Sequence, residues 1–119
     1  MKFVTTYFFI PILECFKFLM KMEKTKADAV VSFQLFKSSS SVAANYRAVC
    51  RGKSSADFLN KLKIVDEEAD ESLFWLEFIQ GLELDCDKVQ LDKLIKEADE
   101  LEAIFSAGIK TIKAKNNIK

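Results

Sequence analysis

Helix-breaking residues are scarce in this sequence, and that scarcity restricts the possible folds more than any other feature. The 119 residues contain one proline and three glycines. A sheet of short strands needs many turn residues, whereas long helices need few. The chain is 50% hydrophobic and 30% charged, which is typical of a globular domain with a single core. We therefore expect one all-α domain over residues 1–119.

Apolar residues recur at helical spacing in four stretches, which predicts helices over residues of about 6–22, 28–51, 55–80 and 87–113. Ser54 or Ser55, together with Asp57, marks the start of the third helix, and Asp87 with Gln90 marks the start of the fourth. Short joints between long helices predict an antiparallel up-down four-helix bundle. The serine run 38–41 leaves an alternative open, because serine is a mediocre helix former and the run suits a flexible linker.

The first twenty residues resemble a secretion signal, because an apolar run follows Lys2. Glu14 and Lys17 interrupt this run, no small-x-small cleavage site follows it, and it is too short and too charged to span a bilayer. We interpret the stretch as the first helix of a cytoplasmic protein that makes no membrane contact. Three cysteines without a CxxC pair agree with a reducing compartment. Export, with residues 1–13 removed, is the alternative.

The residue types that common catalytic sites need are largely missing. The chain has no histidine, which excludes Ser/His and Cys/His nucleophile systems and the usual di-iron pattern of helical bundles. Three scattered glycines cannot build a phosphate-cradling loop. The carboxylates within residues 66–71 suit a solvated helical face. The sequence therefore predicts a protein that is not an enzyme and holds no metal and no cofactor.

Positive and negative charges are segregated along the chain. Residues 1–53 carry nine Lys/Arg and three Asp/Glu, residues 54–104 carry five and fifteen, and residues 105–119 carry four and none. Cations near the joint between the second and third helices are expected to contact the phosphates of an anionic partner. The alternative is a structural scaffold in which this cluster pairs with residues 66–71 of an adjacent subunit. The cations in question are Lys37, Arg47, Arg51, Lys53, Lys61 and Lys63.

The second half of the third predicted helix is apolar on almost every side. One face of a single subunit cannot bury so many bulky groups, and a helix that is apolar all round is normally buried all round. We therefore expect Phe74, Trp75 and Phe78 to contact another subunit in a homo-oligomer. The alternative is that the first and fourth helices cover these side chains completely.

Several segments resemble the four-helix bundle proteins of the 23S rRNA intervening-sequence family, which were once labelled S23 ribosomal proteins. These segments are residues 40–47, 50–51, 54, 56–58, 61–64 and 67–78, and the similarity extends from about Phe8 to Lys113. The most specific parts are the stretch around Asn45 and the segment Glu68–Glu77. The resemblance implies a ring-like homo-oligomer, with a pentamer suspected, and no enzymatic activity. It also implies that the protein binds structured RNA or an RNA-associated protein, because relatives include accessory proteins of diversity-generating retroelements.

Three positions depart from the family pattern. Lys37 and Lys53 stand where the family commonly has arginine, and Ala48 stands where it commonly has glutamate. Lysine keeps the charge but lacks the bidentate fork of arginine, so a binding role at these two positions is weaker. With Asn45 added to the basic cluster, we expect an oligomeric all-α bundle that binds structured RNA or an RNA-associated protein through its second helix. The ring-like form is what the resemblance implies.

Overall fold

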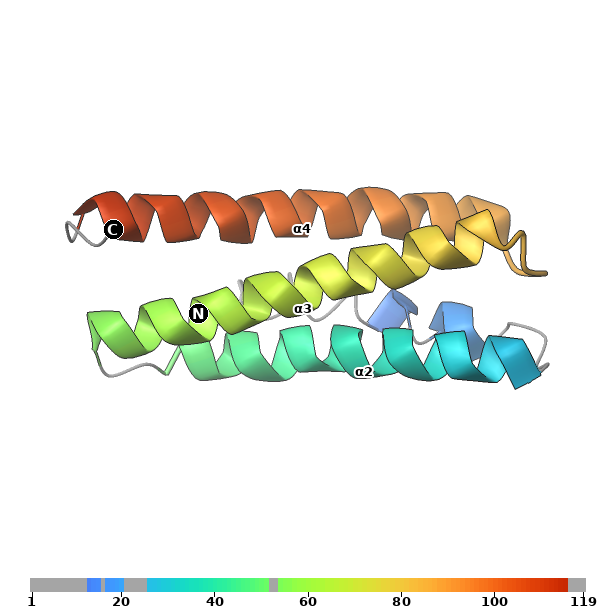
Figure 1. Ribbon diagram of the computed structural model, residues 1–119, viewed down its shortest axis with the longest axis horizontal. Helices are drawn as coiled ribbons and strands as arrows, with labels where there is room; N and C mark the ends of the chain where they lie inside the picture. Colours follow the sequence, from blue (N-terminus) through green and yellow to red (C-terminus); the bar gives the residue numbers. More distant parts are fainter. Residues whose placement is uncertain (1–12, 16, 21–25, 52–53, 116–119) are drawn as a thin grey trace.

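Long antiparallel helices form the molecule, of which this computed structural model describes residues 13–15, 17–20, 26–51 and 54–115. The helices are α2 (Lys26–Val49), α3 (Ser55–Gly81) and α4 (Lys88–Lys115), and residues 13–15 and 17–20 are also helical. Within these ranges the chain contains no strand, so the all-helical prediction is confirmed. The three long helices lie side by side with α3 in the middle (Figure 1). Parts of the expected first helix fall outside the described residues, namely 6–12, 16 and 21–22. The expected helix break at Gly52 also falls outside them.

Capping side chains explain where α3 and α4 begin. The Ser54 hydroxyl accepts a hydrogen bond of 3.1 Å from the backbone N–H of Asp57, so Ser54, and not Ser55, is the cap of α3. A carboxylate oxygen of Asp87 accepts a bond of the same length from the backbone N–H of Gln90 before α4. Glu83, with a φ of 54°, adopts the left-handed conformation in the connection that follows α3. This turn reverses the chain direction between α3 and α4.

The serine run is helical, and its hydroxyl groups bond to the carbonyl oxygens of the preceding turn. Ser38 and Ser39 donate to the carbonyl oxygens of Leu35 and Phe36, each at 3.3 Å. Ser40 donates to the Phe36 carbonyl at 2.7 Å. Such back-bonding satisfies the hydroxyl groups without breaking the helix. The linker alternative for residues 38–41 is therefore wrong.

The core consists of two apolar clusters that follow each other along the bundle, separated by a layer of serines. Ser38, Ser39 and Ser72 of this layer are only 1%, 5% and 7% exposed. A 3.0 Å hydrogen bond from the Ser72 hydroxyl to the Ser38 hydroxyl joins α3 to α2 across the layer. On one side lie Cys15, Phe18, Leu19, Val31, Leu35, Leu76, Ile79, Leu91 and Leu94; on the other lie Val42, Val49, Leu62, Val65, Ala69, Leu101 and Phe105.

The antiparallel order decides which residues meet at the ends of the bundle. The last turns of α2, the first turns of α3 and the last turns of α4 all lie at one end, on the left of Figure 1. Residues that are distant in the sequence, such as Arg51 and Lys113, therefore lie at the same end of the molecule. The candidate functional surface is at this end.

Candidate nucleic-acid interface

Positive charge gathers at the end of the bundle formed by residues 43–51, 54–65 and 102–115, which we call the basic end. It contains seven Lys/Arg residues against two acidic residues, Asp57 and Glu102. The rest of the described chain contains six Lys/Arg residues and fifteen acidic ones. The molecule is therefore polarised, with a basic end and an acidic remainder. The seven cations are Arg47, Arg51, Lys61, Lys63, Lys110, Lys113 and Lys115.

None of these seven side chains forms an ion pair within the part of the chain that the structure describes. Arg47, Arg51 and Lys110 are exposed to solvent. The ion pair that the structure does contain, between Lys17 and Glu14 at 3.6 Å, lies within the N-terminal helical segment. The positive charge of the basic end is thus not neutralised by neighbouring helices of the same subunit. Such a surface raises the local concentration of anions around it.

The structure brings together most of the cations that the sequence grouped, but not all of them. Arg47, Arg51, Lys61 and Lys63 lie at the basic end. Lys37 precedes Arg51 by fourteen residues, which is about 21 Å along a helix, so it lies outside the basic end. Its charge acts on Glu68 of α3 instead of on the joint.

Asn45 of the predicted surface does not add a free binding group to the basic end. The side-chain amide of Asn45 donates to the carbonyl oxygen and the hydroxyl oxygen of Ser41, both at 2.9 Å. Its donors are therefore engaged within α2. Lys53 falls outside the described residues.

Three cations of the basic end were missing from the sequence-based surface: Lys110, Lys113 and Lys115. The sequence shows the positive charge of residues 105–119, but the charge became part of this surface only through the antiparallel topology. In an up-down bundle the end of the fourth helix lies beside the joint between the second and third helices. The predicted up-down topology could therefore have identified these three lysines from the sequence.

Tyr46 lies beneath the basic end and is part of the core. Its ring packs against Phe105 with the ring centroids 5.8 Å apart. Burial raises the pKa of Tyr46 to about 12, and the charge of Cys50 and a hydrogen bond with that thiol act in the same direction. Tyr46 is half-buried and its ring packs on Phe105, so it belongs to the core and not to an exposed stacking face.

Three aromatic rings of α3 form a contiguous group, which we call the aromatic face: Phe74, Trp75 and Phe78. Their ring centroids are separated by 4.9, 5.6 and 5.8 Å. Phe74 is 53% exposed and Phe78 is 41% exposed, so neighbouring helices of the subunit leave them uncovered. Trp75 is half-buried against the core, and its indole N–H donates to a carboxylate oxygen of Glu71 at 3.4 Å. The aromatic face thus presents exposed apolar rings on the surface of a single subunit.

Comparison with known proteins places the chain in a family. The family model described as 23S rRNA-intervening sequence protein matches residues 12–107. The chain belongs to this family. A solved structure of a protein of unknown function from the S23 ribosomal protein family of Bacteroides thetaiotaomicron VPI-5482 is similar to it, with a TM-score of 0.73 and 31% sequence identity. The similarity covers 89% of this chain and 94% of that one. No curated protein matches the chain.

The described residues of this member of the 23S rRNA-intervening sequence family contain neither a membrane-spanning helix nor a cluster of metal ligands. No helix there has an apolar run of the length that a membrane crossing requires. No group of three or more Cys, Asp or Glu side chains in the same residues is arranged to hold a metal ion. The basic end is therefore the surface of this family member whose chemistry points most clearly to a ligand.

The acidic remainder of this family member is most concentrated on α3. Residues 66–77 contain six carboxylates and no cation. Asp66 of α3 and Glu102 of α4 lie close enough for their carboxyls to affect each other's pKa. Burial raises the pKa of both carboxyls, and the nearby charges of Asp70 and Asp99 raise the pKa of Glu102 further. Two acids in contact across a helix interface share a proton more easily than they bear two charges.

Because the pKa values of Asp66 and Glu102 are raised, we expect the protein to be more stable in mild acid than at pH 7. The folded state holds protons on these groups more tightly than the unfolded state, so stability falls as the pH rises through their range. We expect Glu102→Gln to raise the midpoint of thermal unfolding at pH 7 by roughly 1 °C, because solvent screens these partly exposed carboxyls. We also expect it to reduce the gain in stability when wild type is acidified from pH 7 toward pH 5.

Thermal unfolding followed by circular dichroism at both pH values measures this effect. Glu100→Gln is the matched control, because Glu100 is exposed on the same helix. A wild-type midpoint that decreases steadily on acidification, with no gain from Glu102→Gln, would contradict the interpretation.

Proposed function

We propose that the protein binds structured RNA through the basic end, by contacts to phosphates and without catalysis. The observation that carries this proposal is the set of seven cations, drawn from three helices, that have no acidic partner in the described part of the subunit. Each Lys or Arg that neutralises a phosphate releases condensed counterions, which favours association. The printed description of the family, which refers to a 23S rRNA intervening sequence, agrees with an RNA ligand.

The surroundings of these cations favour phosphate contacts over recognition of unpaired bases. Sequence-tolerant binding of single strands usually relies on exposed aromatic rings that stack on bases. Among the described residues of the basic end, the aromatic side chains Tyr46, Phe58 and Phe105 are half-buried or buried. A folded RNA with a regular backbone offers the closely spaced phosphates that such a surface recognises.

Binding of a fluorescently labelled RNA hairpin at several salt concentrations tests the proposal. We expect the affinity to fall steeply with salt, because counterion release supplies the driving force. The triple variant Arg47→Glu, Arg51→Glu, Lys110→Glu changes three exposed side chains of the basic end. It should lose at least roughly 100-fold in affinity and lower the slope of log affinity against log salt by about 3.

The matched control is the triple variant Lys88→Glu, Lys93→Glu, Lys96→Glu, which makes the same charge change at exposed positions in the first half of α4. This control should keep most of the affinity. Wild type that fails to bind the hairpin at low salt would contradict the proposal. If the Arg47, Arg51 and Lys110 variant then also loses its subunit assembly, the scaffold alternative, with ion pairs between subunits, explains the basic end.

Self-association through the aromatic face is the second part of the proposal, and a ring-like homo-oligomer, with a pentamer suspected, is its expected form. The observation in support is the exposure of Phe74 and Phe78 beside the half-buried Trp75. Exposed apolar groups that lie next to one another commonly mark a subunit contact. A ring would also repeat the basic end and present several copies to one RNA, which increases avidity.

The variants Phe74→Glu and Phe78→Glu test self-association. Both side chains are already partly exposed, so the subunit fold should tolerate the change. We expect the mass from light scattering to fall toward the 13.6 kDa of one chain, because a carboxylate in an apolar contact is costly to desolvate. Ile64→Glu is the control, since Ile64 is 41% exposed, like Phe78, and precedes Phe74 by ten residues, or about 15 Å, along α3. An unchanged mass in the two phenylalanine variants would exclude this face as the contact.

A further inference from the structure

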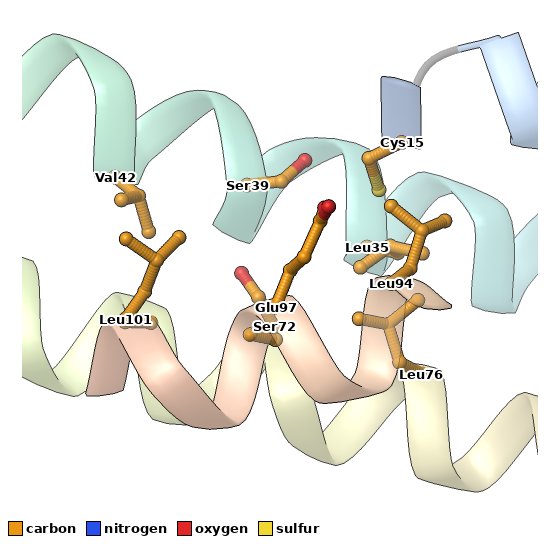
Figure 2. A pocket seen from close by; sticks show the side chains of 11 residues that line it. Cys15, Leu35, Ser39, Val42, Ser72, Leu76, Leu94, Glu97 and Leu101 are labelled. Carbon is orange, nitrogen blue, oxygen red and sulfur yellow. The ribbon is translucent and has the colours of Figure 1, made fainter. Parts of the chain in front are cut away.

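A small, partly open cavity interrupts the core at the level of the serine layer. Its volume is about 40 Å³, and all four helical segments contribute to its wall. Most of the wall is aliphatic, but three oxygen-bearing side chains and one thiol also line it. The cavity is shown in Figure 2, and these polar residues are Cys15, Ser39, Ser72 and Glu97.

Glu97 is the most unusual of these residues. Its side chain extends from α4 into the cavity in the direction of Ser39 (Figure 2). Its Oε2 atom is buried and has no hydrogen-bond partner in the described part of the protein. A buried polar atom without a partner is costly and rare in native proteins, and a bound water or ion is a common explanation.

No other polar group of the cavity donates to Glu97 Oε2 in this structure. The single hydrogen of the Ser39 hydroxyl is within reach of the Phe36 carbonyl at 3.3 Å and of the Cys15 sulfur. The Ser72 hydroxyl hydrogen is within reach of the Glu68 carbonyl at 2.9 Å and of the Ser38 hydroxyl at 3.0 Å. In this arrangement both serines direct their hydrogens away from Glu97 and present lone pairs to the cavity.

The Cys15 thiol adds no strong donor and no charge. Burial raises the pKa of Cys15 to about 12, although a hydrogen bond with Ser39 acts in the opposite direction. The thiol therefore stays protonated, and an S–H group is a weak donor. The cavity thus combines three oxygen acceptors with no strong donor among its described lining.

We propose that this cavity binds a small guest that donates hydrogen bonds or positive charge to Glu97, Ser39 and Ser72. The guest is a water molecule or a monovalent cation of similar size, such as ammonium. The space is sufficient, because one water needs roughly 10–15 Å³ of this kind of volume. Three oxygens do not provide the six or more ligands that Ca²⁺ requires, which excludes a divalent site of that type. A guest here satisfies Glu97 and completes the polar layer between the two apolar clusters.

High-resolution crystal structures of wild type and Glu97→Met test the proposal directly. We expect wild type to show an ordered density peak within hydrogen-bonding distance of Glu97 Oε2, and we expect Glu97→Met to lack it. Methionine is apolar and similar in length, so the variant no longer buries a carboxylate. Its thermal midpoint should rise by roughly 5 °C. Glu100→Met, at an exposed position of the same helix, is the control and should change the midpoint much less.

Thermal unfolding in ammonium chloride and in sodium chloride at equal ionic strength distinguishes the two guests. A higher wild-type midpoint in ammonium chloride, absent in Glu97→Met, identifies a cation. Equal midpoints together with the density peak identify water.

Glu97→Gln is the second variant, for use if Glu97→Met does not fold. Its amide brings its own hydrogen-bond donors, so it should remove the density peak without lowering the thermal midpoint. No peak in wild type, or a side chain of the protein bonded to Glu97 Oε2, would overturn the proposal.

Discussion

The contact between Ser38 and Ser72 fixes how α2 lies against α3, and most of the architecture depends on that register. The two hydroxyl groups are 3.0 Å apart and almost fully buried. Because the helices are antiparallel and joined by a short connection, one such contact determines which turns face each other along their whole length. Val42 then lies at the level of Ala69, and Leu35 at the level of Leu76, within the two apolar clusters. A shift by one turn would keep the same helix faces in contact but would separate the Ser38 and Ser72 hydroxyls and place them against apolar side chains.

The same register produces the separation of charge. With the helix ends aligned, Arg47 and Arg51 of α2 come together with the last turns of α4. The seven cations repel one another, and the apolar core holds them together at the cost of that repulsion. A polyanion that binds the basic end removes the repulsion, so ligand binding and subunit stability should be linked. The acidic pair of Asp66 and Glu102 shows the same principle with the opposite sign, since burial and neighbouring charges raise the pKa of both carboxyls.

The sequence predicted the helices well because their apolar period is strong and their breakers are few. Buried positions such as Val31, Leu35, Leu62 and Leu94 follow directly from that period. The burial of Ser72 did not, since a serine between Glu71 and Leu73 carries no sign of a partner serine on another helix. Ile104 also falls on the apolar period of α4 but is 48% exposed, because the period alone does not tell how wide a buried stripe is.

The candidate site was harder to predict than the fold, because it depends on how the helix ends are placed in three dimensions. Arg47 and Arg51 were found from their local density of charge. Lys37 was grouped with them by sequence proximity, although a straight helix carries it away from the joint and toward Glu68. Lys110 and Lys113 join the surface only through the bundle topology. Glu97 gave no signal at all, since an isolated glutamate on a charged helix resembles an exposed residue.

The most direct test of this account is to measure which lysines bound RNA protects from chemical acylation. The protein would be labelled with and without an RNA hairpin, and the modified peptides quantified by mass spectrometry. The account predicts protection of Lys110, Lys113 and Lys115 at the basic end, with Lys88, Lys93 and Lys96 labelled equally in both samples. Equal labelling of all six lysines, or protection confined to Lys88, Lys93 and Lys96, would contradict the assignment of the basic end as the RNA-binding surface.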